Sequence, residues 1–273
     1  MDRGYVLHSY PYRETSLILQ VWTQKHGRLG LVAKGARRPK SASRAVLIPF
    51  QPLSLDWFGR GELRTLKTAE PASPATPLGG SSLLSAFYLN ELLLKLTTRD
   101  DPHEGLFEAY DAAITELRAL SRMASRAAAH EVAEPAPEPT RDIEPILRRF
   151  ELRLLQELGY ALELSREAGS GKALEPGHDY WYVVERGPIR VIEGATYSNA
   201  VKLHGQTLID LERGHLEDPA TVAQSKQLMR LLIHQCLNGQ ELATRTLVRD
   251  LQHLGDRAHP PSSGGLSPED GEP

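Results

Sequence analysis

The chain has 273 residues and a formal net charge of −3, with 40% hydrophobic and 25% charged residues, which is ordinary for a globular protein of one domain or two. Its apolar runs are short and interrupted by charge, which excludes a membrane-spanning helix, and no apolar signal-peptide core follows Met1. The single cysteine, Cys236, excludes an internal disulfide and a cysteine-based zinc site. We therefore expect a cytoplasmic protein with no membrane partner.

The charge is distributed unevenly along the chain. Residues 1–80 hold 12 Lys and Arg against 5 Asp and Glu, whereas residues 81–273 hold 20 against 30. A basic first segment on an acidic body predicts a polyanion as partner of that segment, and nucleic acid is the commonest such partner.

Residues 1–70 have the pattern of a small β-barrel. Leu53, Leu55 and Trp57 alternate with Ser54 and Asp56, and glycines mark the reversals. The expected strands are residues 4–10, 15–23, 28–34, 49–58 and 63–69. Five strands in this length suit an OB fold, and an SH3-like barrel fits the pattern nearly as well.

A basic loop, Lys34-Gly35-Ala36-Arg37-Arg38-Pro39-Lys40, follows the third expected strand. Further cations lie in the surrounding strands and turns, namely Arg13, Lys25, Arg28, Arg44 and Arg60. These charges predict either a phosphate-binding surface or a solvated loop, and their spacing alone favours neither.

After a linker rich in Pro and Gly at residues 71–80, the apolar period changes from 2 to 3.6. Helices are expected over residues 81–96, from about 100 to 117, and over 142–158, which form the first part of a helical domain (81–164). Residues 122–140 are rich in alanine and then in Glu-Pro repeats, and we expect a mobile insertion there.

Residues 165–200 read as an irregular, cysteine-free insert. Its aromatic run, Tyr180-Trp181-Tyr182, either covers the edge of a core or receives a peptide or a base. The second part of the helical domain (201–255) contains a helix that begins at Pro219 and a short one that begins at Thr244, and residues 256–273 are expected to be disordered. The fold class is therefore multi-domain α+β, an OB barrel (1–80) followed by an all-α domain.

Binding of nucleic acid needs cations for the phosphates and aromatic faces for the bases. The barrel supplies several aromatic candidates, namely Tyr10, Tyr12, Trp22, Trp57 and Phe58. Trp22 and Trp57 lie in apolar alternation, which favours core packing, whereas Tyr12 beside Pro11 is the better candidate for exposure.

Catalytic and metal-binding motifs are weak. Lys34-Gly35 lacks the residue order of a P-loop, and His178-Asp179 and the pair His234 and Cys236 lack the further ligands of a tetrahedral zinc site. Cys236 lies on the apolar stripe of a helix, which favours a buried structural thiol. No tight acidic cluster suggests a two-metal nuclease.

Several motifs together resemble a known family. Residues 6–17 contain Pro-Tyr-Arg-Glu-Thr-Ser, residues 26–29 read His-Gly-Arg-Leu, and residues 32–38 end in Lys-Gly-Ala-Arg-Arg. This order resembles the N-terminal domain of the bacterial DNA repair protein RecO family. Similar segments follow at residues 49–53, 148–151, 158–160 and 225–230, so the resemblance covers about residues 1–255.

The resemblance implies an OB barrel, a helical domain and, in many members, a zinc module with four cysteines. This chain lacks those cysteines, so no metal or other cofactor is expected. The family resemblance also implies a recombination mediator and not an enzyme. Such proteins bind single- and double-stranded DNA, anneal complementary strands without ATP, act on strands coated with single-stranded DNA-binding protein (SSB), and with RecR help to load RecA at gaps.

Carried onto this chain, the resemblance implies a DNA-binding set of Arg28, Lys34, Arg37, Arg38, Lys40, Arg44 and Tyr12. Arg13 is either part of this set or paired with a carboxylate. The acidic SSB tail, which ends in an aromatic residue, would dock on the helical domain, with Arg148, Arg149 and Lys226 as candidate acceptors. Two alternatives stay open, an RNA-binding OB protein and a scaffold whose basic segment only steers encounters.

Overall fold

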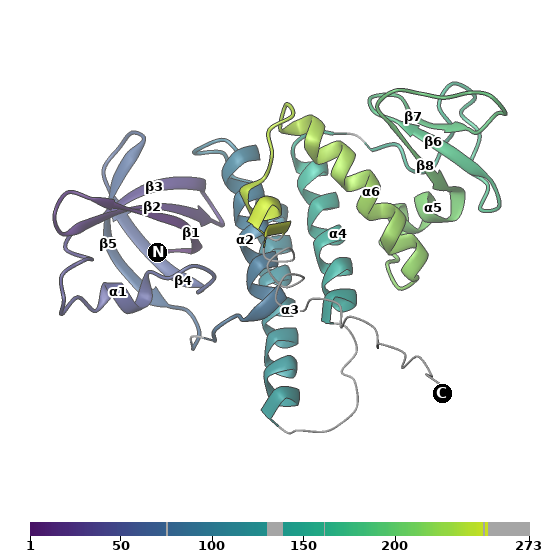
Figure 1. Ribbon diagram of the computed structural model, residues 1–273. Coiled ribbons are helices and arrows are strands. Elements are labelled where there is room, and N and C mark those ends of the chain that lie inside the picture. The colour runs from purple at the N-terminus through teal and green to yellow at the C-terminus, as the bar shows by residue number, and fades with distance from the viewer. Residues whose placement is uncertain (75, 130–138, 161, 248, 251–273) are drawn as a thin grey trace, which may run out of the picture.

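The computed structural model describes residues 1–74, 76–129, 139–160, 162–247 and 249–250. Figure 1 shows three parts side by side: a β-barrel at one end, a group of long helices in the middle and a small sheet at the other end. No helix within these described ranges is long and apolar enough to cross a membrane.

The barrel consists of β1 (Asp2–Tyr12), β2 (Ser16–Thr23), β3 (Gly27–Ala33), β4 (Leu53–Phe58) and β5 (Leu63–Pro71). It closes in the order β1-β2-β3-β5-β4, with β3 and β5 parallel. A short helix, α1 (Ser43–Val46), precedes β4. The inner residues form a closed apolar core of Val6, Leu19, Val21, Leu29, Leu31, Leu53 and Leu55. The predicted OB-type barrel is confirmed, and each expected strand is present.

The helical body consists of α2 (Gly80–Leu96), α3 (Glu104–Ala129), α4 (Pro139–Glu157), α5 (Gly205–Arg213) and α6 (Pro219–Cys236). The prediction of a mobile insertion from residue 122 is wrong for its first part, because α3 continues to Ala129. Alanine is the best helix former, so the Ala-rich composition that resembled low complexity also favours a helix. Residues 130–138 of that insertion lie outside the described residues, as does the tail 256–273.

The segment expected to be irregular contains a second sheet, which corrects that prediction. Strands β6 (Asp179–Val183), β7 (Gly187–Arg190) and β8 (Ala200–His204) pair antiparallel in the order β7-β6-β8. Tyr180 and Tyr182 are buried on one face of β6, while Trp181 between them is only partly buried. The aromatic run therefore covers the edge of a core, as one of the two interpretations held.

The segment after α6 is tied back to α2. The backbone N–H groups of Ala243 and Thr244 both donate to the carboxylate of Glu91, at 2.8 and 2.9 Å. This carboxylate caps the helical turns that begin at Ala243, so the short terminal helix expected near Thr244 is confirmed.

The barrel and the helical body share one apolar cluster. Tyr5, Trp22 and Phe50 of the barrel pack with the helices rather than with the barrel core. The amide of Asn90 donates to the carbonyl of Leu7 at 2.8 Å, in the same interface. This contact buries part of the barrel surface, whereas the loop after β3 is largely exposed.

Candidate nucleic-acid interface

The basic loop is held in place by its own backbone. Ala36 is buried in the barrel core, and the N–H of Arg37 donates to the carbonyl of Thr15 at 2.9 Å. Gly35 has φ +71°, a conformation that glycine adopts without strain. The loop after β3 is therefore fixed against the β1–β2 turn, so its cations have defined positions.

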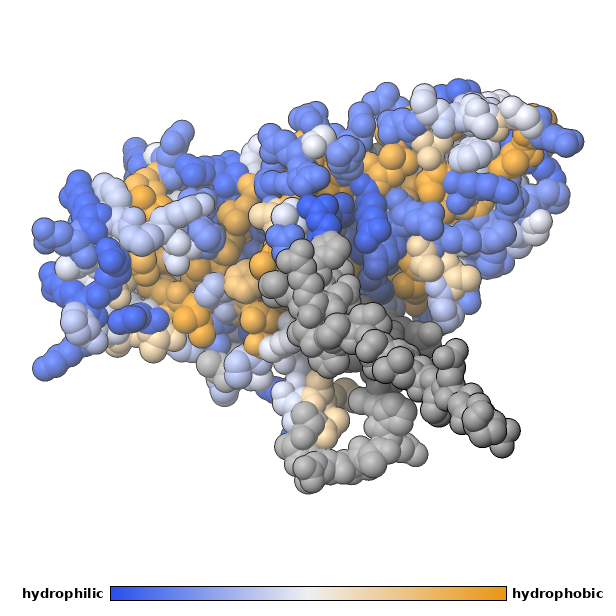
Figure 2. Space-filling model, in the orientation of Figure 1, coloured by the Kyte–Doolittle hydropathy of each residue, from blue (hydrophilic) through white to orange (hydrophobic). Residues whose placement is uncertain are grey.

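An open pocket of about 690 Å³ lies beside this loop. Its walls come from the β1–β2 turn, from β3 and the loop after it, and from β5, and they include Tyr12, Arg13, Glu14, Thr15, Ser16, Val32, Lys34, Gly35, Arg38 and Thr65. Three cations and one carboxylate line it, so the pocket favours an anionic ligand. In Figure 2 hydrophilic residues cover most of the free end of the barrel, and hydrophobic residues gather toward the helices.

The structure brings together three members of the predicted DNA-binding set, because Tyr12, Lys34 and Arg38 all line this pocket. The guanidinium of Arg13 joins them and lies 5.2 Å from the centroid of the Tyr12 ring, a cation–π distance. Arg13 is thus a pocket residue rather than the partner of a carboxylate.

The other four members, Arg28, Arg37, Lys40 and Arg44, lie outside the pocket lining. The side chain of Arg37 is exposed, but its Nη1 donates to the carbonyl oxygens of Arg13 and Glu14 at 3.3 and 3.4 Å. Lys40, in the segment that leads to α1, and Arg44, within α1, are both exposed. We conclude that Arg37 positions the β1–β2 turn, and that Lys40 and Arg44 lie farther along the same basic surface.

Arg28 lies at the junction with the helical body. Its Nη2 donates to the carbonyl of Thr97 at 2.8 Å and its Nη1 donates to Gln20 at 3.4 Å. Burial lowers the pKa of Arg28, and the neighbouring charge of Arg99 lowers it further. Its first role is therefore to join the two parts of the molecule.

The two tryptophans pack as their spacing predicted. Trp22 is fully buried in the junction and Trp57 packs on the barrel core. Tyr10 and Phe58 are 48% and 57% exposed, whereas Tyr12, the candidate that the sequence favoured for exposure, is half-buried.

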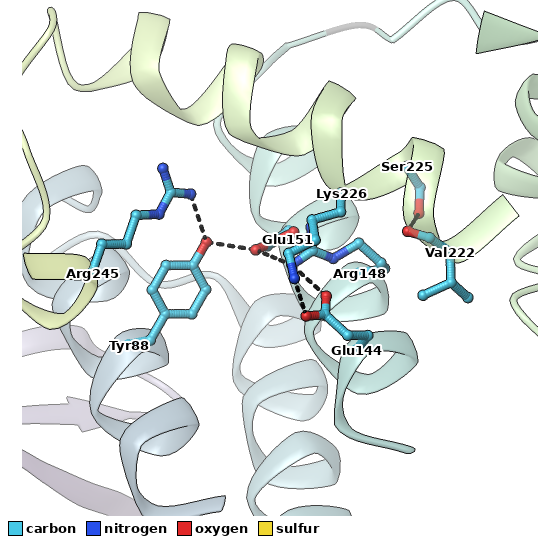
Figure 3. Close-up of polar contacts among 8 residues, drawn as sticks. All are labelled: Tyr88, Glu144, Arg148, Glu151, Val222, Ser225, Lys226 and Arg245. Atoms are coloured by element: carbon cyan, nitrogen blue, oxygen red, sulfur yellow. Dashed lines mark hydrogen bonds and ion pairs between the residues drawn. The ribbon is translucent and has the colours of Figure 1, made fainter. Parts of the chain in front are cut away.

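Arg148, a predicted acceptor of the SSB tail, is instead buried in an ionic network (Figure 3). Only 4% of its side chain is exposed, and it pairs with Glu151 at 2.9 Å and Glu144 at 3.7 Å. Tyr88 donates to Glu151 at 2.5 Å, and Lys226 pairs with Glu144 at 2.5 Å. Arg148 is therefore not open to a partner, and Lys226 already holds a carboxylate.

Burial is the main influence on the carboxyl group of Glu151. It raises the pKa of Glu151, against the attraction of Arg148 and the hydrogen bond from Tyr88. The network links α2, α4 and α6 within the helical body, which is a structural role.

Arg149, unlike Arg148, is accessible to a partner. It is about half exposed, pairs with Glu116 at 2.5 Å, and lines an open pocket of about 490 Å³ between α3 and α4. The lining combines apolar side chains such as Ile146 and Phe150 with a second cation, Arg153, and two carboxylates, Glu108 and Glu116. Arg153 is also about half exposed and pairs with Glu157 at 2.6 Å. Arg153 was not among the predicted acceptors, although its spacing of four residues from Arg149 on one helix is a usable signal.

The histidine and cysteine candidates of the sequence analysis have other surroundings in the structure. Within the described ranges, no three His, Cys, Asp or Glu side chains lie close enough to hold a metal ion. Asp179 pairs instead with Lys202 at 2.8 Å. Burial raises the pKa of the Cys236 thiol, which is opposite to what a nucleophilic cysteine requires.

Comparisons with known proteins agree across the whole fold. Residues 1–75 match the family model for the N-terminal domain of recombination protein O, and residues 137–245 match the model for its C-terminal domain. The chain is 46% identical over 251 residues to the DNA repair protein RecO of Nitrosospira multiformis, covering 92% of this chain and 95% of that protein.

The DNA repair protein RecO of Ralstonia nicotianae is 49% identical over 251 residues, covering 92% of this chain and 84% of that protein. That of Aromatoleum aromaticum is 43% identical over 251 residues, covering 92% and 95%. The barrel, the helical body and the sequence therefore agree, and the chain belongs to the RecO family of DNA repair proteins.

Proposed function

We propose that this protein is a recombination mediator that binds single- and double-stranded DNA through its barrel. In this role it anneals complementary strands, including strands coated with SSB, and with RecR it promotes the loading of RecA at gaps. The observation that carries the proposal is the open pocket on the barrel that Tyr12, Arg13, Lys34 and Arg38 line together.

The chemistry of this pocket supports binding that is independent of sequence. Guanidinium and ammonium groups neutralise phosphates and release counterions, and this raises the affinity for any nucleic acid. These contacts do not distinguish one base from another. Two strands that anneal must bring two phosphate backbones together, and a cationic surface lowers that repulsion. No nucleotide hydrolysis is needed for either effect.

The pocket between α3 and α4 supports the proposed contact with SSB. The SSB tail is acidic and ends in an aromatic residue, and this pocket offers Arg149 and Arg153 beside the apolar side chains of Ile146 and Phe150. Both arginines are about half exposed, so the carboxylates of the tail can replace their present partners, Glu116 and Glu157. We therefore place the tail here rather than at Arg148, whose charge is buried and paired.

Binding to DNA is tested by fluorescence anisotropy with a single-stranded oligonucleotide, its duplex and an RNA of the same sequence. We expect the Lys34→Ala/Arg38→Ala variant to bind both DNA forms more weakly, whatever their sequence. The control variant Lys172→Ala/Arg186→Ala removes the same charge from exposed positions near the small sheet, and it should bind as the wild type does. Equal affinities of the two variants would contradict the assignment of the pocket, and a clear preference for RNA would support an RNA-binding protein instead.

A further inference from the structure

One continuous row of side chains crosses all five strands of the barrel. Tyr10 of β1 is the cross-strand partner of Ile18 in β2, and Ile18 is the partner of Val32 in β3. Val32 is the partner of Thr65 in β5, and Thr65 is the partner of Phe58 in β4. Because directly opposed residues share a face of a sheet, these five side chains lie side by side on one surface.

This row lies on the outer surface of the barrel. The residues next to it along the strands point inward and pack in the barrel core, namely Leu19, Leu31 and Leu66. Four steps of about 4.8 Å between strands give a track about 19 Å long. That length suits the shorter sites of OB folds, which hold about 4 nucleotides.

The row has an apolar middle and exposed aromatic ends. Ile18, Val32 and Thr65 are half-buried, whereas Tyr10 and Phe58 are 48% and 57% exposed. Every base has a face that stacks on such an exposed aromatic ring. The middle of the row offers a single hydroxyl, that of Thr65, so it contains little with which to read the edge of a particular base.

Cations lie along one side of the row. Val32 and Thr65 belong both to the row and to the pocket that Arg13, Lys34 and Arg38 line. A strand whose bases lie on the row would therefore place its phosphates beside these three charges. This complementarity of apolar and charged groups matches a single-stranded polynucleotide.

We propose that unpaired bases of a single strand stack on Tyr10 and Phe58, at the two ends of this row, while the phosphates follow Lys34 and Arg38. The proposal rests on the proposed DNA-binding function and adds the groups that distinguish single strands from duplex. The bases of a duplex are stacked on one another and cannot reach the rings, so only the phosphate contacts serve a duplex.

The test compares Tyr10→Ala and Phe58→Ala with the wild type by fluorescence anisotropy. The probes are an oligothymidylate, a blunt duplex and an abasic strand with the same number of phosphates. We expect each variant to lose about tenfold in affinity for oligothymidylate, as loss of one stacked base predicts. Affinity for the duplex and for the abasic strand, and the dependence on salt, should stay unchanged.

Two further variants sharpen the comparison. Tyr10→Phe keeps the ring and should keep the affinity for oligothymidylate. Ile192→Ala shortens an apolar side chain that is 66% exposed just after β7, and it should change nothing. Unchanged duplex binding also shows that each variant is folded.

The possible failures can be separated. Wild-type affinity of both alanine variants for oligothymidylate, or an equal loss on the abasic strand, would overturn the stacking row and leave the proposed function intact. A wild-type protein that binds none of the three probes would overturn the proposed function itself.

Discussion

Arg37 and Arg38 are adjacent in the chain, yet the structure gives them different roles. The guanidinium of Arg38 lines the open pocket, while that of Arg37 donates to the carbonyl oxygens of Arg13 and Glu14. A pattern of charges predicts that a loop is basic, but it does not tell which cation faces a ligand. That distinction depends on where the β1–β2 turn lies, about twenty residues earlier.

The first prediction concerns the salt dependence of binding to single strands. Arg38→Ala should flatten the slope of log K against log salt by about 0.7, because one phosphate contact is lost. Arg37→Ala should lower the affinity and leave that slope unchanged, since its guanidinium holds a turn. Binding titrations over a range of salt concentrations measure both, and an equal flattening in the two variants would contradict the division of roles.

The second prediction concerns the buried ionic network. Glu151→Ala would leave the guanidinium of Arg148 buried without its 2.9 Å partner, so we expect the free energy of unfolding to fall by about 3–5 kcal/mol. Glu116→Ala is the matched control, because it removes the 2.5 Å partner of the half-exposed Arg149 and should cost no more than about 1 kcal/mol. Urea unfolding measures both, and a cost for Glu151→Ala as small as that of the control would show that the network does not hold the helices together.

At the scale of elements, the tight approach between the β2–β3 turn and the loop before α3 sets where the barrel sits. Gly27 has φ +65°, and a Cβ atom built there would lie 2.0 Å from the carbonyl oxygen of Asp101. The positive φ favours glycine at this turn, and the close approach of the Asp101 carbonyl leaves no room for a Cβ atom. The His-Gly-Arg-Leu motif at this turn therefore has a structural reason.

The third prediction follows from this contact. Gly27→Ala should destabilise the protein by well over the 1–2 kcal/mol that a left-handed conformation costs a residue with a Cβ, because the backbone of Asp101 must also move. Gly61→Ala has a positive φ of 91° but nothing within 4 Å of the added atom, so it should lose only the conformational part. Thermal or urea unfolding measures the loss of stability in each variant. Equal losses in the two variants would mean that the backbone of Asp101 moves away from the added Cβ atom at no cost in free energy.

The fourth prediction concerns α4 and its pocket against α3. Arg149→Ala/Arg153→Ala should weaken the binding of a labelled peptide with the sequence of the SSB tail, because the acidic residues lose two cations. A peptide without the terminal aromatic residue should bind weakly to wild type and variant alike. Lys172→Ala/Arg186→Ala serves again as the charge control, and a similar loss of peptide binding in that variant would remove the pocket from consideration.

The barrel strands and the long helices were predictable from the sequence because their apolar periods are local. The end of α3 and the strands of the small sheet were not predictable, for physical reasons. The end of α3 is rich in alanine and has little apolar stripe to mark it, and the strands of the small sheet are four or five residues long, shorter than a clear alternation needs. Likewise the buried network of Arg148 and Glu151 includes Tyr88, which donates to Glu151 from 60 positions before Arg148 in the chain, and no local pattern contains such a contact.

At the scale of the whole molecule, the barrel is docked through Tyr5, Trp22 and Phe50 onto an acidic helical body. This arrangement commits one side of the barrel to the body and leaves the side with the pocket and the aromatic row exposed. Because the body carries the excess of Asp and Glu, it repels a polyanion and favours the basic barrel as the site of contact. The proposed SSB contact lies apart from that surface, between α3 and α4, so one molecule can hold the tail and a strand together.

Strand annealing by the barrel is tested most directly with two complementary oligonucleotides coated with SSB, whose annealing is followed by fluorescence quenching in the absence of nucleotide. We expect rapid annealing by the wild type, a large loss of rate in Lys34→Ala/Arg38→Ala, and the wild-type rate in Lys172→Ala/Arg186→Ala. If the wild-type protein binds bare strands tightly but does not accelerate annealing, the proposed mediator function is wrong and the protein only binds nucleic acid.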